Sequence, residues 1–340
     1  MKILHIAEAQ NFTKPFFSLI ENNFKHQDHA ILSRGNINNW PAELKIKNNT
    51  LTGYKWIFTF LKDSKNAEKI ILHGLWDFRL IFMLWLTPSV LEKCYWVIWG
   101  GDLYKYSLGT KNLKWHIAEF FRRSIISRFG HLVSYIPGDV ELARKWYGAT
   151  GKYHDCIVYT SNIYRQHQTS EKPKTTINIQ IGNSADSTNN HFEILEKLKP
   201  FLNEDICIYA PLSYGNIDYA KKVISVATEI FGDKFKPLTE PLPFDEYLCF
   251  LNKIDVAVFN HKRQQAMGNT ITLLGLGKKV YMRSDITPWQ MFKSHEIKIF
   301  DIEHINLEKI PENHRDSNIN AIKTKFSEAT LLLGLGKIFN

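Results

Sequence analysis

The sequence predicts an α/β protein made of two doubly wound, Rossmann-like domains that face a cleft. Short apolar runs alternate along the chain with segments of helical periodicity, and this alternation is typical of parallel sheets rather than of hairpins. The length indicates two domains, because 340 residues exceed what one hydrophobic core usually organises. A polar stretch at 166–176, which contains Pro173, is interpreted as the linker between them.

Each domain contains its own set of apolar runs, which are short enough to be buried parallel strands. In the first domain, expected at 1–165, the runs lie at 3–7, 29–33, 70–73, 95–99, 132–136 and 156–159. In the second domain, expected at 177–340, they lie at 177–181, 206–210, 254–259, 279–282 and 297–300. On this interpretation the last helix of the chain is free to pack back onto the first domain.

The chain carries an excess of positive charge. Lysine and arginine outnumber aspartate and glutamate by 43 to 34, which gives a net charge of +9. This balance favours a phosphorylated substrate, an anionic membrane surface or another polyanion, and it does not choose among them. Nucleic acid is the least favoured partner, because the basic residues are spread along the chain rather than gathered in one stripe.

The sequence has no feature typical of a secreted, membrane-spanning or metal-binding protein. Its four cysteines, Cys94, Cys156, Cys207 and Cys249, are too far apart in sequence to suggest a disulfide framework or a CxxC site. The N-terminus lacks a secretion signal, and the most apolar stretch, 80–86, is far shorter than the ~20 residues of a spanning helix. The cysteine pattern and the N-terminus lead us to expect a cytoplasmic protein. Because the histidines are scattered and no HExxH occurs, we expect no metal, and we assign no other cofactor.

The loops that follow the strands of the second domain are rich in glycine, small hydroxyls and amides. Such loops meet at one edge of a parallel sheet, where ligands of doubly wound domains bind. Any one of them reads equally well as a capped turn, but the recurrence of this composition after three strands favours a ligand site with donors for a diphosphate. The residues predicted to form it are Gly182, Asn183, Ser184, Asp186, Pro211, Ser213, Tyr214, Asn260, Arg263 and Gln264.

The third of these loops leads into a helix expected at 270–276. First-turn amides and the helix dipole favour an anion, so Gly268, Asn269 and Thr270 are predicted to hold phosphate, with Arg263 adding charge. The alternative is an ordinary βαβ unit in which Gly268 is a turn residue and Asn269 or Thr270 is a cap. Neither a Walker motif nor a GxGxxG fingerprint occurs, which argues against ATP hydrolysis and hydride transfer.

The loops of the first domain carry carboxylates that suit acid–base chemistry. Asp102 follows two glycines at a predicted strand end and is a candidate general base. The alternative role for Asp102 is to cap the next helix. His73 and Asp77, after the preceding strand, are rival candidates, although His73 also fits a core histidine that is hydrogen-bonded to the backbone.

Between residues 104 and 129, aromatic residues are interleaved with basic ones. The apolar residues Leu113, Ile117, Phe120, Phe121 and Ile125 share helical spacing, and we expect this stripe to pack inward. The surrounding basic and aromatic residues suit an anionic bilayer or a lipid diphosphate. The residues assigned to this acceptor or membrane contact are Tyr104, Lys111, Lys114, Trp115, Arg122 and Arg123.

Four spaced motifs together resemble a known family. They are WGGDLY at 99–104, IGNSADSTNNH at 181–191, YAPLSYG at 209–215, and FNHKRQQAMGN at 259–269 followed by LLGLGKKVY. This combination is similar to the bacterial TDP-N-acetylfucosamine:lipid II N-acetylfucosaminyltransferases, glycosyltransferase family 56. The resemblance implies a GT-B fold and transfer of 4-acetamido-4,6-dideoxygalactose from its dTDP donor to an undecaprenyl-diphosphate-linked disaccharide, for enterobacterial common antigen. It also implies a peripheral enzyme at the cytoplasmic face of the inner membrane.

The resemblance suggests a role for each domain. The C-terminal domain would hold the nucleotide diphosphate, with Arg263 opposite the departing group and Tyr214 at the base or ribose. The N-terminal domain would present the acceptor, and Asp102 would take its proton if the reaction inverts; inversion and retention both stay open. The alternatives are a transferase of another surface polysaccharide with a related donor, and a noncatalytic module that binds nucleotide sugars or anionic lipids.

Overall fold

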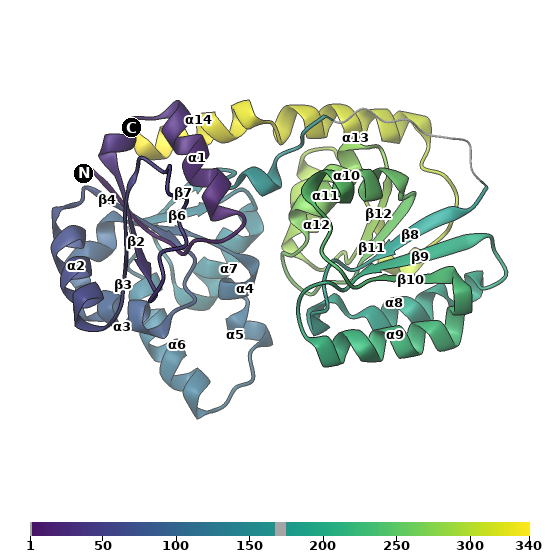
Figure 1. Ribbon diagram of the computed structural model, residues 1–340, viewed down its shortest axis with the longest axis horizontal. Coiled ribbons are helices and arrows are strands. Elements are labelled where there is room, and N and C mark those ends of the chain that lie inside the picture. The colour runs from purple at the N-terminus through teal and green to yellow at the C-terminus, as the bar shows by residue number, and fades with distance from the viewer. Residues whose placement is uncertain (1, 167–174) are drawn as a thin grey trace. The chain divides into compact units, whose positions relative to one another are not determined.

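The computed structural model describes residues 2–166 and 175–340, which form two compact units (Figure 1). The N-terminal unit comprises the residues up to Ser161 together with Glu328–Asn340, and the C-terminal unit comprises Asn162–Ser327. The last helix, α14 (Glu328–Phe339), therefore belongs to the N-terminal unit. Most of the predicted linker, 167–174, lies outside the described residues.

The N-terminal unit is built on a seven-stranded parallel sheet of order β3-β2-β1-β4-β5-β6-β7. Its strands are β1 (Ile3–Ile6), β2 (His29–Arg34), β3 (Lys47–Leu51), β4 (Lys69–His73), β5 (Cys94–Val97), β6 (His131–Ser134) and β7 (Lys152–Asp155). Two predictions were wrong here. The polar edge strand β3 was not expected, and the last strand precedes the apolar run at 156–159.

Helices cover both faces of this sheet. They are α1 (Thr13–Asn23), α2 (Gly53–Asn66), α3 (Phe78–Leu86), α4 (Gly100–Leu103), α5 (Lys105–Leu108), α6 (Leu113–Ile126), α7 (Pro137–Tyr147) and α14, with short turns η1 (His26–Asp28), η2 (Pro88–Lys93) and η3 (Thr160–Asn162). On one face, Leu4 and Leu72 of the sheet join a buried cluster with Trp56 of α2 and Leu84 of α3. Side chains alternate along a strand, so His5 lies on the other face, where it contacts α1 and α14.

The C-terminal unit has a six-stranded parallel sheet of order β10-β9-β8-β11-β12-β13. Its strands are β8 (Ile177–Ile181), β9 (Ile206–Pro211), β10 (Phe235–Leu238), β11 (Val256–Phe259), β12 (Lys279–Met282) and β13 (Phe300–Asp301). Its helices are α8 (His191–Leu198), α9 (Ile217–Phe231), α10 (Phe244–Lys253), α11 (Met267–Gly275), α12 (Thr287–Ser294) and α13 (Glu312–Lys325), with short turns η4 (Ser187–Asn189), η5 (Lys199–Phe201), η6 (Gly232–Lys234) and η7 (Ile302–His304). The expected strands are confirmed near their predicted positions, and β10 is an additional edge strand.

Both sheets change winding direction next to their first strand. In the N-terminal unit β1 lies between β2 and β4, and in the C-terminal unit β8 lies between β9 and β11. Loops on either side of such a switch point diverge and leave a crevice beyond the carboxyl ends of the strands. The loops after β1, β4 and β5, and those after β8, β9 and β11, are therefore where a ligand site is expected.

Candidate functional site

Asn189 is the centre of a hydrogen-bonded cluster at the carboxyl edge of the C-terminal sheet. Its side chain is fully buried in the loop that follows β8. The Oδ1 atom accepts from the amide of Asn183 at 2.8 Å and lies 2.8 Å from Nε2 of His261. The Nδ2 atom donates to Ser184 Oγ at 3.1 Å and to the carbonyl of Asp186 at 3.0 Å. One buried amide thus shapes the loop after β8 and connects it to the loop after β11.

Side chains from three loops are also linked directly to one another. The Thr188 hydroxyl lies 2.8 Å from Gln265 Oε1, and Gln265 Nε2 donates to Asn183 Oδ1 at 3.3 Å. Asn183 Nδ2 in turn donates to the Tyr214 hydroxyl at 3.0 Å. The predicted convergence of these loops is therefore present, and the residues that hold it together include Thr188, Asn189 and Gln265, which the sequence did not single out.

Gly182 is required by this arrangement for two reasons. Its φ of +59° lies in the left-handed region, and a Cβ at this position would lie 2.4 Å from His191 Nε2 and 2.8 Å from Asn189 Oδ1. The glycine lets the chain turn directly after β8 and pass close to the buried cluster. Its own backbone is buried there, because its amide donates to the Val258 carbonyl at 3.1 Å and its carbonyl accepts from Gln180 Nε2 at 3.0 Å.

Helix α11 begins three residues earlier than expected. Its N-cap is Ala266, whose φ of 55° is an uncommon, strained value for a residue with a side chain. The Thr270 amide and hydroxyl both donate to the Ala266 carbonyl, at 2.9 and 3.0 Å. The amides of Met267, Gly268 and Asn269 precede that first helical bond and point out of the helix start. The prediction for Thr270 is corrected, because its buried hydroxyl serves its own helix.

Positive charge lies beside this helix start. Arg263 is half-buried and donates from Nη1 to the Gln264 carbonyl at 3.1 Å, and Lys262 next to it is exposed. Burial, with the charge of Arg263 as a second cause, lowers the pKa of His261 to about 3. The histidine is therefore neutral near pH 7, and the cations of the loop are Lys262 and Arg263.

Other predicted donor-binding residues have structural roles. Burial raises the pKa of Asp186, but hydrogen bonds from the Thr188 amide and hydroxyl, with the Arg263 charge, outweigh it, so the pKa is lowered overall. Asp186 is the N-cap of η4 and is half-buried, and its contact with the donor stays a prediction. Pro211 is the last residue of β9, and the Asn269 amide donates to the Tyr247 hydroxyl at 2.8 Å.

Two predicted residues have a buried polar atom that no described side chain or backbone group satisfies. They are Asn260, through Nδ2, and Gln264, through Oε1. Both belong to the loop between β11 and α11. Buried polar atoms are nearly always paired, so these two atoms are suited to bonding a ligand or water. Ser213 is half-buried and Tyr214 is exposed in the neighbouring loop after β9.

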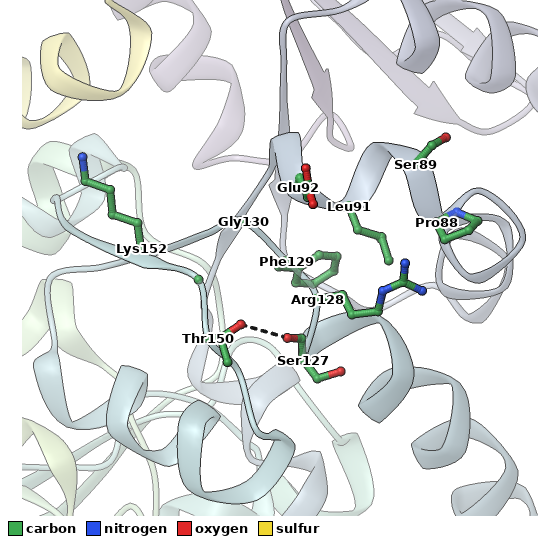
Figure 2. Close-up of a pocket in the computed structure, with 11 residues that line it drawn as sticks. Pro88, Ser89, Leu91, Glu92, Ser127, Arg128, Phe129, Gly130, Thr150 and Lys152 are labelled. Carbon is green, nitrogen blue, oxygen red and sulfur yellow. Dashed lines mark hydrogen bonds between the residues drawn. The ribbon is translucent and has the colours of Figure 1, made fainter.

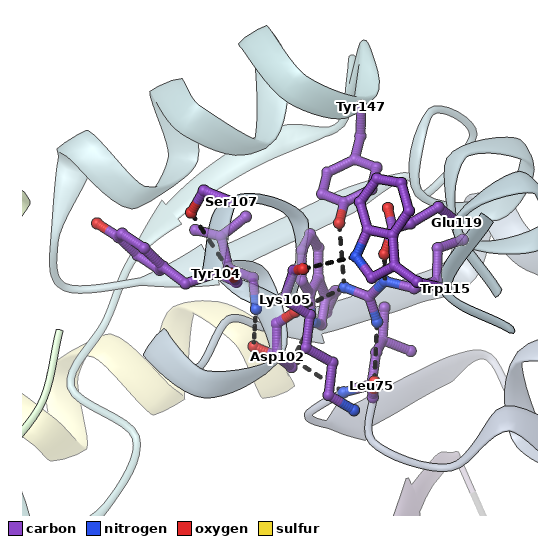
Figure 3. Close-up of polar contacts among 11 residues, drawn as sticks. Leu75, Asp102, Tyr104, Lys105, Ser107, Trp115, Glu119 and Tyr147 are labelled. Carbon is purple, nitrogen blue, oxygen red and sulfur yellow. Dashed lines mark hydrogen bonds and ion pairs between the residues drawn. The ribbon is translucent and has the colours of Figure 1, made fainter. Parts of the chain in front are cut away.

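In the N-terminal unit, Asp102 is a buried structural carboxylate rather than an accessible base. Its Oδ2 accepts from the Leu75 amide at 2.8 Å and the Trp96 indole at 2.9 Å. Its Oδ1 accepts from the Trp99 and Leu103 amides, at 2.8 and 2.7 Å. Figure 3 shows Asp102 among its polar contacts. Burial raises the pKa of Asp102, and the Arg122 charge opposes that shift. Both oxygens are occupied away from solvent, so the prediction of Asp102 as general base is corrected.

Arg122 is the cationic partner inside this same cluster. It donates to the carbonyls of Asp102 and Leu75, at 2.7 and 2.9 Å, and pairs with Glu119 at 3.0 Å. The Tyr104 hydroxyl is buried as well and donates to Asp139. Neither Arg122 nor Tyr104 is accessible to an acceptor or a membrane, so these two predictions are corrected, whereas Lys111, Lys114 and Arg123 are exposed and Trp115 is half-buried.

The rival catalytic candidates also have structural partners. Asp77 caps α3 through the Arg79 amide and forms an ion pair with Arg34. His73 lies in a buried row of four side chains whose order in space is Tyr159, His73, His5 and His29. Successive contacts in the row measure 2.6 Å from the Tyr159 hydroxyl to His73 Nδ1, 3.0 Å from His73 to His5, and 2.9 Å from His5 to His29. Burial lowers the pKa of His73 to about 3, so it is a poor base at neutral pH.

Trp76 is a half-exposed aromatic residue at this edge that the sequence did not single out. Its indole lies against Gly74 and Gly101, and Lys105 Nζ lies 5.3 Å from a ring centroid. Glu8, just beyond β1, is an exposed carboxylate at the switch point of the sheet. The motif HGLW did not distinguish Trp76 from a core aromatic, since only the packing shows its exposed face.

A pocket of about 570 Å³ lies at the opposite edge of the N-terminal sheet (Figure 2). It is lined by η2, by Ser127 and Arg128 after α6, and by Thr150 and Lys152 at the start of β7. None of the predicted site residues lines it. Among the described residues there is also no cluster of three histidine, cysteine or acidic side chains that could hold a metal ion.

Known proteins are similar to this chain both in sequence and in architecture. The model of a family described as 4-alpha-L-fucosyltransferase glycosyl transferase group 56 matches residues 31–326. Three solved structures are similar over nearly the whole of both chains. They are sucrose-phosphate synthase from Thermosynechococcus elongatus (10% identity, covering 100% and 98% of the two chains, TM-score 0.68), a glycosyltransferase from Rickettsia africae (11%, 99% and 97%, 0.67), and Anabaena HepE in complex with UDP and glucose (9%, 100% and 99%, 0.69). At these identities the similarity shows the fold, which is GT-B.

Proposed function

We propose a specific reaction for this chain, which belongs to the 4-alpha-L-fucosyltransferase family, glycosyltransferase group 56, and is a glycosyltransferase. The reaction is transfer of 4-acetamido-4,6-dideoxy-D-galactose from dTDP to an undecaprenyl-diphosphate-linked disaccharide, in the synthesis of enterobacterial common antigen. Its support is the family match together with the motifs at 99–104, 181–191, 209–215 and 259–269. The enzyme is proposed to act as a peripheral protein at the cytoplasmic face of the inner membrane.

The observation that carries the donor assignment is the linked loop cluster of the C-terminal unit. The hydrogen bonds between Thr188 and Gln265 and between Gln265 and Asn183 fix the loop after β8 against the loop that leads into α11. Anabaena HepE, which shares the fold, was solved with UDP and glucose, and a nucleotide sugar is the corresponding proposal here. In this proposal the amides of Met267, Gly268 and Asn269 at the start of α11 supply donors to the diphosphate.

Negative charge grows on the departing dTDP as its bond to the sugar breaks. Groups that are already oriented toward that charge lower the barrier more than groups that must reorganise. Arg263 and the free amides at the start of α11 are held in place by the loop cluster, so we assign them to the leaving diphosphate. Tyr214, exposed beside Asn183, is assigned to the nucleoside.

The acceptor hydroxyl needs a proton acceptor if the reaction inverts. Among the carboxylates of the described strand-end loops in the N-terminal unit, Asp77, Asp102 and Asp139 are committed to partners inside the fold. Glu8 is exposed directly after β1, at the switch point of the sheet. We therefore assign the general base to Glu8 in place of Asp102.

The experiment that tests this function is a transfer assay with radiolabelled dTDP-sugar and membranes that contain the lipid-linked disaccharide. We expect label in the lipid fraction with the wild-type protein and about 100-fold less with Arg263→Ala. Parallel reactions with a UDP-sugar separate a related transferase from the proposed one. Binding of dTDP without transfer to any acceptor would instead support a noncatalytic module.

A further inference from the structure

Helix α6 turns three apolar side chains toward solvent, where a typical surface helix presents polar ones. Leu113, Ile117 and Phe120, at i, i+4 and i+7, are 76%, 48% and 64% exposed. The face turned inward carries the ion pair of Glu119 and Arg122. The expectation that the apolar stripe packs inward is therefore wrong for these three residues, whereas Ile125 of the same stripe is buried and Phe121 is half-buried.

Helix α3 presents a second outward stripe beside it. Phe78, Phe82 and Trp85, again at i, i+4 and i+7, are exposed, although the other side of α3 is buried. The two stripes meet at Phe121 of α6, whose ring centroid lies 5.6, 5.5 and 5.1 Å from those of the three α3 residues. The exposed rings thus form one continuous aromatic surface, which we call the α3–α6 face. Contiguous apolar surface of this kind usually marks an interaction site.

The exposed charges between Lys105 and Arg128, on and beside α6, have one sign. Between Lys105 and Arg128 the sequence contains one acidic residue, Glu119, which is buried in its ion pair. The exposed charged side chains of this stretch are all basic: Lys105, Lys111, Lys114, Arg123 and Arg128. The pocket at the ends of α3 and α6 is lined by Arg128 and Lys152 and by one exposed acid, Glu92 (Figure 2). An apolar helix face bordered by lysine and arginine is the composition of surfaces that lie in the interface of an anionic bilayer.

We infer that the α3–α6 face docks on a bilayer containing anionic phospholipid. The aromatic and aliphatic side chains would enter the interfacial region while the surrounding cations contact the headgroups. No helix within 2–166 and 175–340 is long and apolar enough to cross a membrane. The inference deepens the proposed function by naming the surface that would bring the enzyme to a lipid-linked acceptor, but bilayer binding is measured independently of transfer.

The test is flotation of the full-length protein with vesicles of phosphatidylethanolamine and phosphatidylglycerol, compared with neutral phosphatidylcholine. We expect binding to the anionic vesicles that weakens with salt, and at least about tenfold weaker binding for the double variant Leu113→Ser/Phe120→Ser. The control is Leu333→Ser on α14, which is 70% exposed outside this face. Circular dichroism of each variant checks that the fold is retained.

Two further experiments distinguish bilayer docking from the proposed transfer reaction. Lys111→Glu/Lys114→Glu is expected to reduce binding to anionic vesicles and to flatten its salt dependence. Transfer to a short, water-soluble acceptor analogue should be unaffected in Leu113→Ser/Phe120→Ser. Undiminished vesicle binding by Leu113→Ser/Phe120→Ser, or equal binding to neutral vesicles, would overturn the docking inference even if transfer is intact. A wild-type protein that binds vesicles but transfers no sugar would overturn only the proposed function.

Discussion

The indole of Trp76 occupies the space that a side chain on Gly101 would fill. A Cβ at Gly101 would lie 2.3 Å from Cη2 of Trp76, and one at Gly74 would lie 2.4 Å from its Nε1. Two glycines from different loops therefore hold one half-exposed ring against the carboxyl edge of the N-terminal sheet. A rigid aromatic face with an open side is suited to stack on a sugar ring of the acceptor.

The first prediction concerns this ring. Trp76→Ala should raise the KM for the acceptor about tenfold and leave the KM for the donor unchanged, because the lost contact lies in the N-terminal unit. Gly101→Ala should have a similar effect by displacing the indole. Gly336→Ala, at a helix position where a Cβ meets nothing within 4 Å, is the matched control. Steady-state kinetics that show an altered donor KM alone would contradict the assignment.

Asp102 is predicted to matter for stability rather than for proton transfer. In Asp102→Asn the new amide group would face the N–H donors that now bond the carboxylate, and Arg122 would lose one of the two carboxylate charges near it, so the free energy of unfolding should fall by about 3 kcal/mol. Asp77→Asn, which alters only a helix cap and a half-buried ion pair, should cost about 1 kcal/mol. Urea denaturation measures both. A stable but inactive Asp102→Asn enzyme would restore Asp102 as the base.

Glu8 is predicted to act in the chemical step. Glu8→Gln keeps the size of this exposed side chain, so the fold and the KM values should be retained while kcat falls about 100-fold or more. The matched control is Glu43→Gln, an exposed glutamate outside the strand-end loops. Single-turnover kinetics separate the chemical step from product release, and an unchanged chemical rate would exclude Glu8 as the base.

The buried histidine row predicts a loss of stability in mild acid. Burial lowers the pKa of His73 to about 3 and that of His29 to about 4, and it lowers the pKa of His5 as well. The unfolded chain binds protons near pH 6.5 and the folded chain does not, so stability decreases as the pH falls from 6.5 toward 4. Each such histidine contributes up to about 1.4 kcal/mol per pH unit.

The measurement is urea unfolding at pH 7.5 and pH 5.0, with histidine NMR as a second observable. Because a neutral imidazole has one donor and one acceptor, the row from Tyr159 to His29 must have one consistent hydrogen-bond direction. Sharp tautomer signals that persist to pH 5 are expected. Equal stability at the two pH values would show that these rings are already protonated or accessible in the folded protein.

The sequence predicted the sheets well because buried parallel strands are encoded by short apolar runs. β8 and β12 lie where expected, whereas the polar edge strand β3 has no such pattern. The strand-end loops of the C-terminal unit were identified from their composition. The hydrogen bonds that connect these loops could not be predicted. Asn189 bonds to Asn183 in its own loop and to His261 in the loop after β11, and no sequence pattern indicates either contact.

The errors in the N-terminal unit share one cause. Sequence position placed Asp102 and Arg122 near a strand end and on a basic helix, respectively, but gave no information on burial. The two residues are held together inside the fold, since Arg122 donates to the Asp102 carbonyl at 2.7 Å. This buried polar cluster lies on the inner side of α6, while Leu113, Ile117 and Phe120 face outward, which helical periodicity alone does not reveal.

The central claim is that the linked loops of the C-terminal unit hold the donor diphosphate. Hydrogen–deuterium exchange of the full-length protein with and without dTDP tests it most directly. We predict slower exchange at 182–190 and 261–270, and a much smaller effect of the same dTDP concentration on Arg263→Ala. Unchanged exchange in both segments at saturating dTDP, or protection confined to the N-terminal unit, would contradict the account.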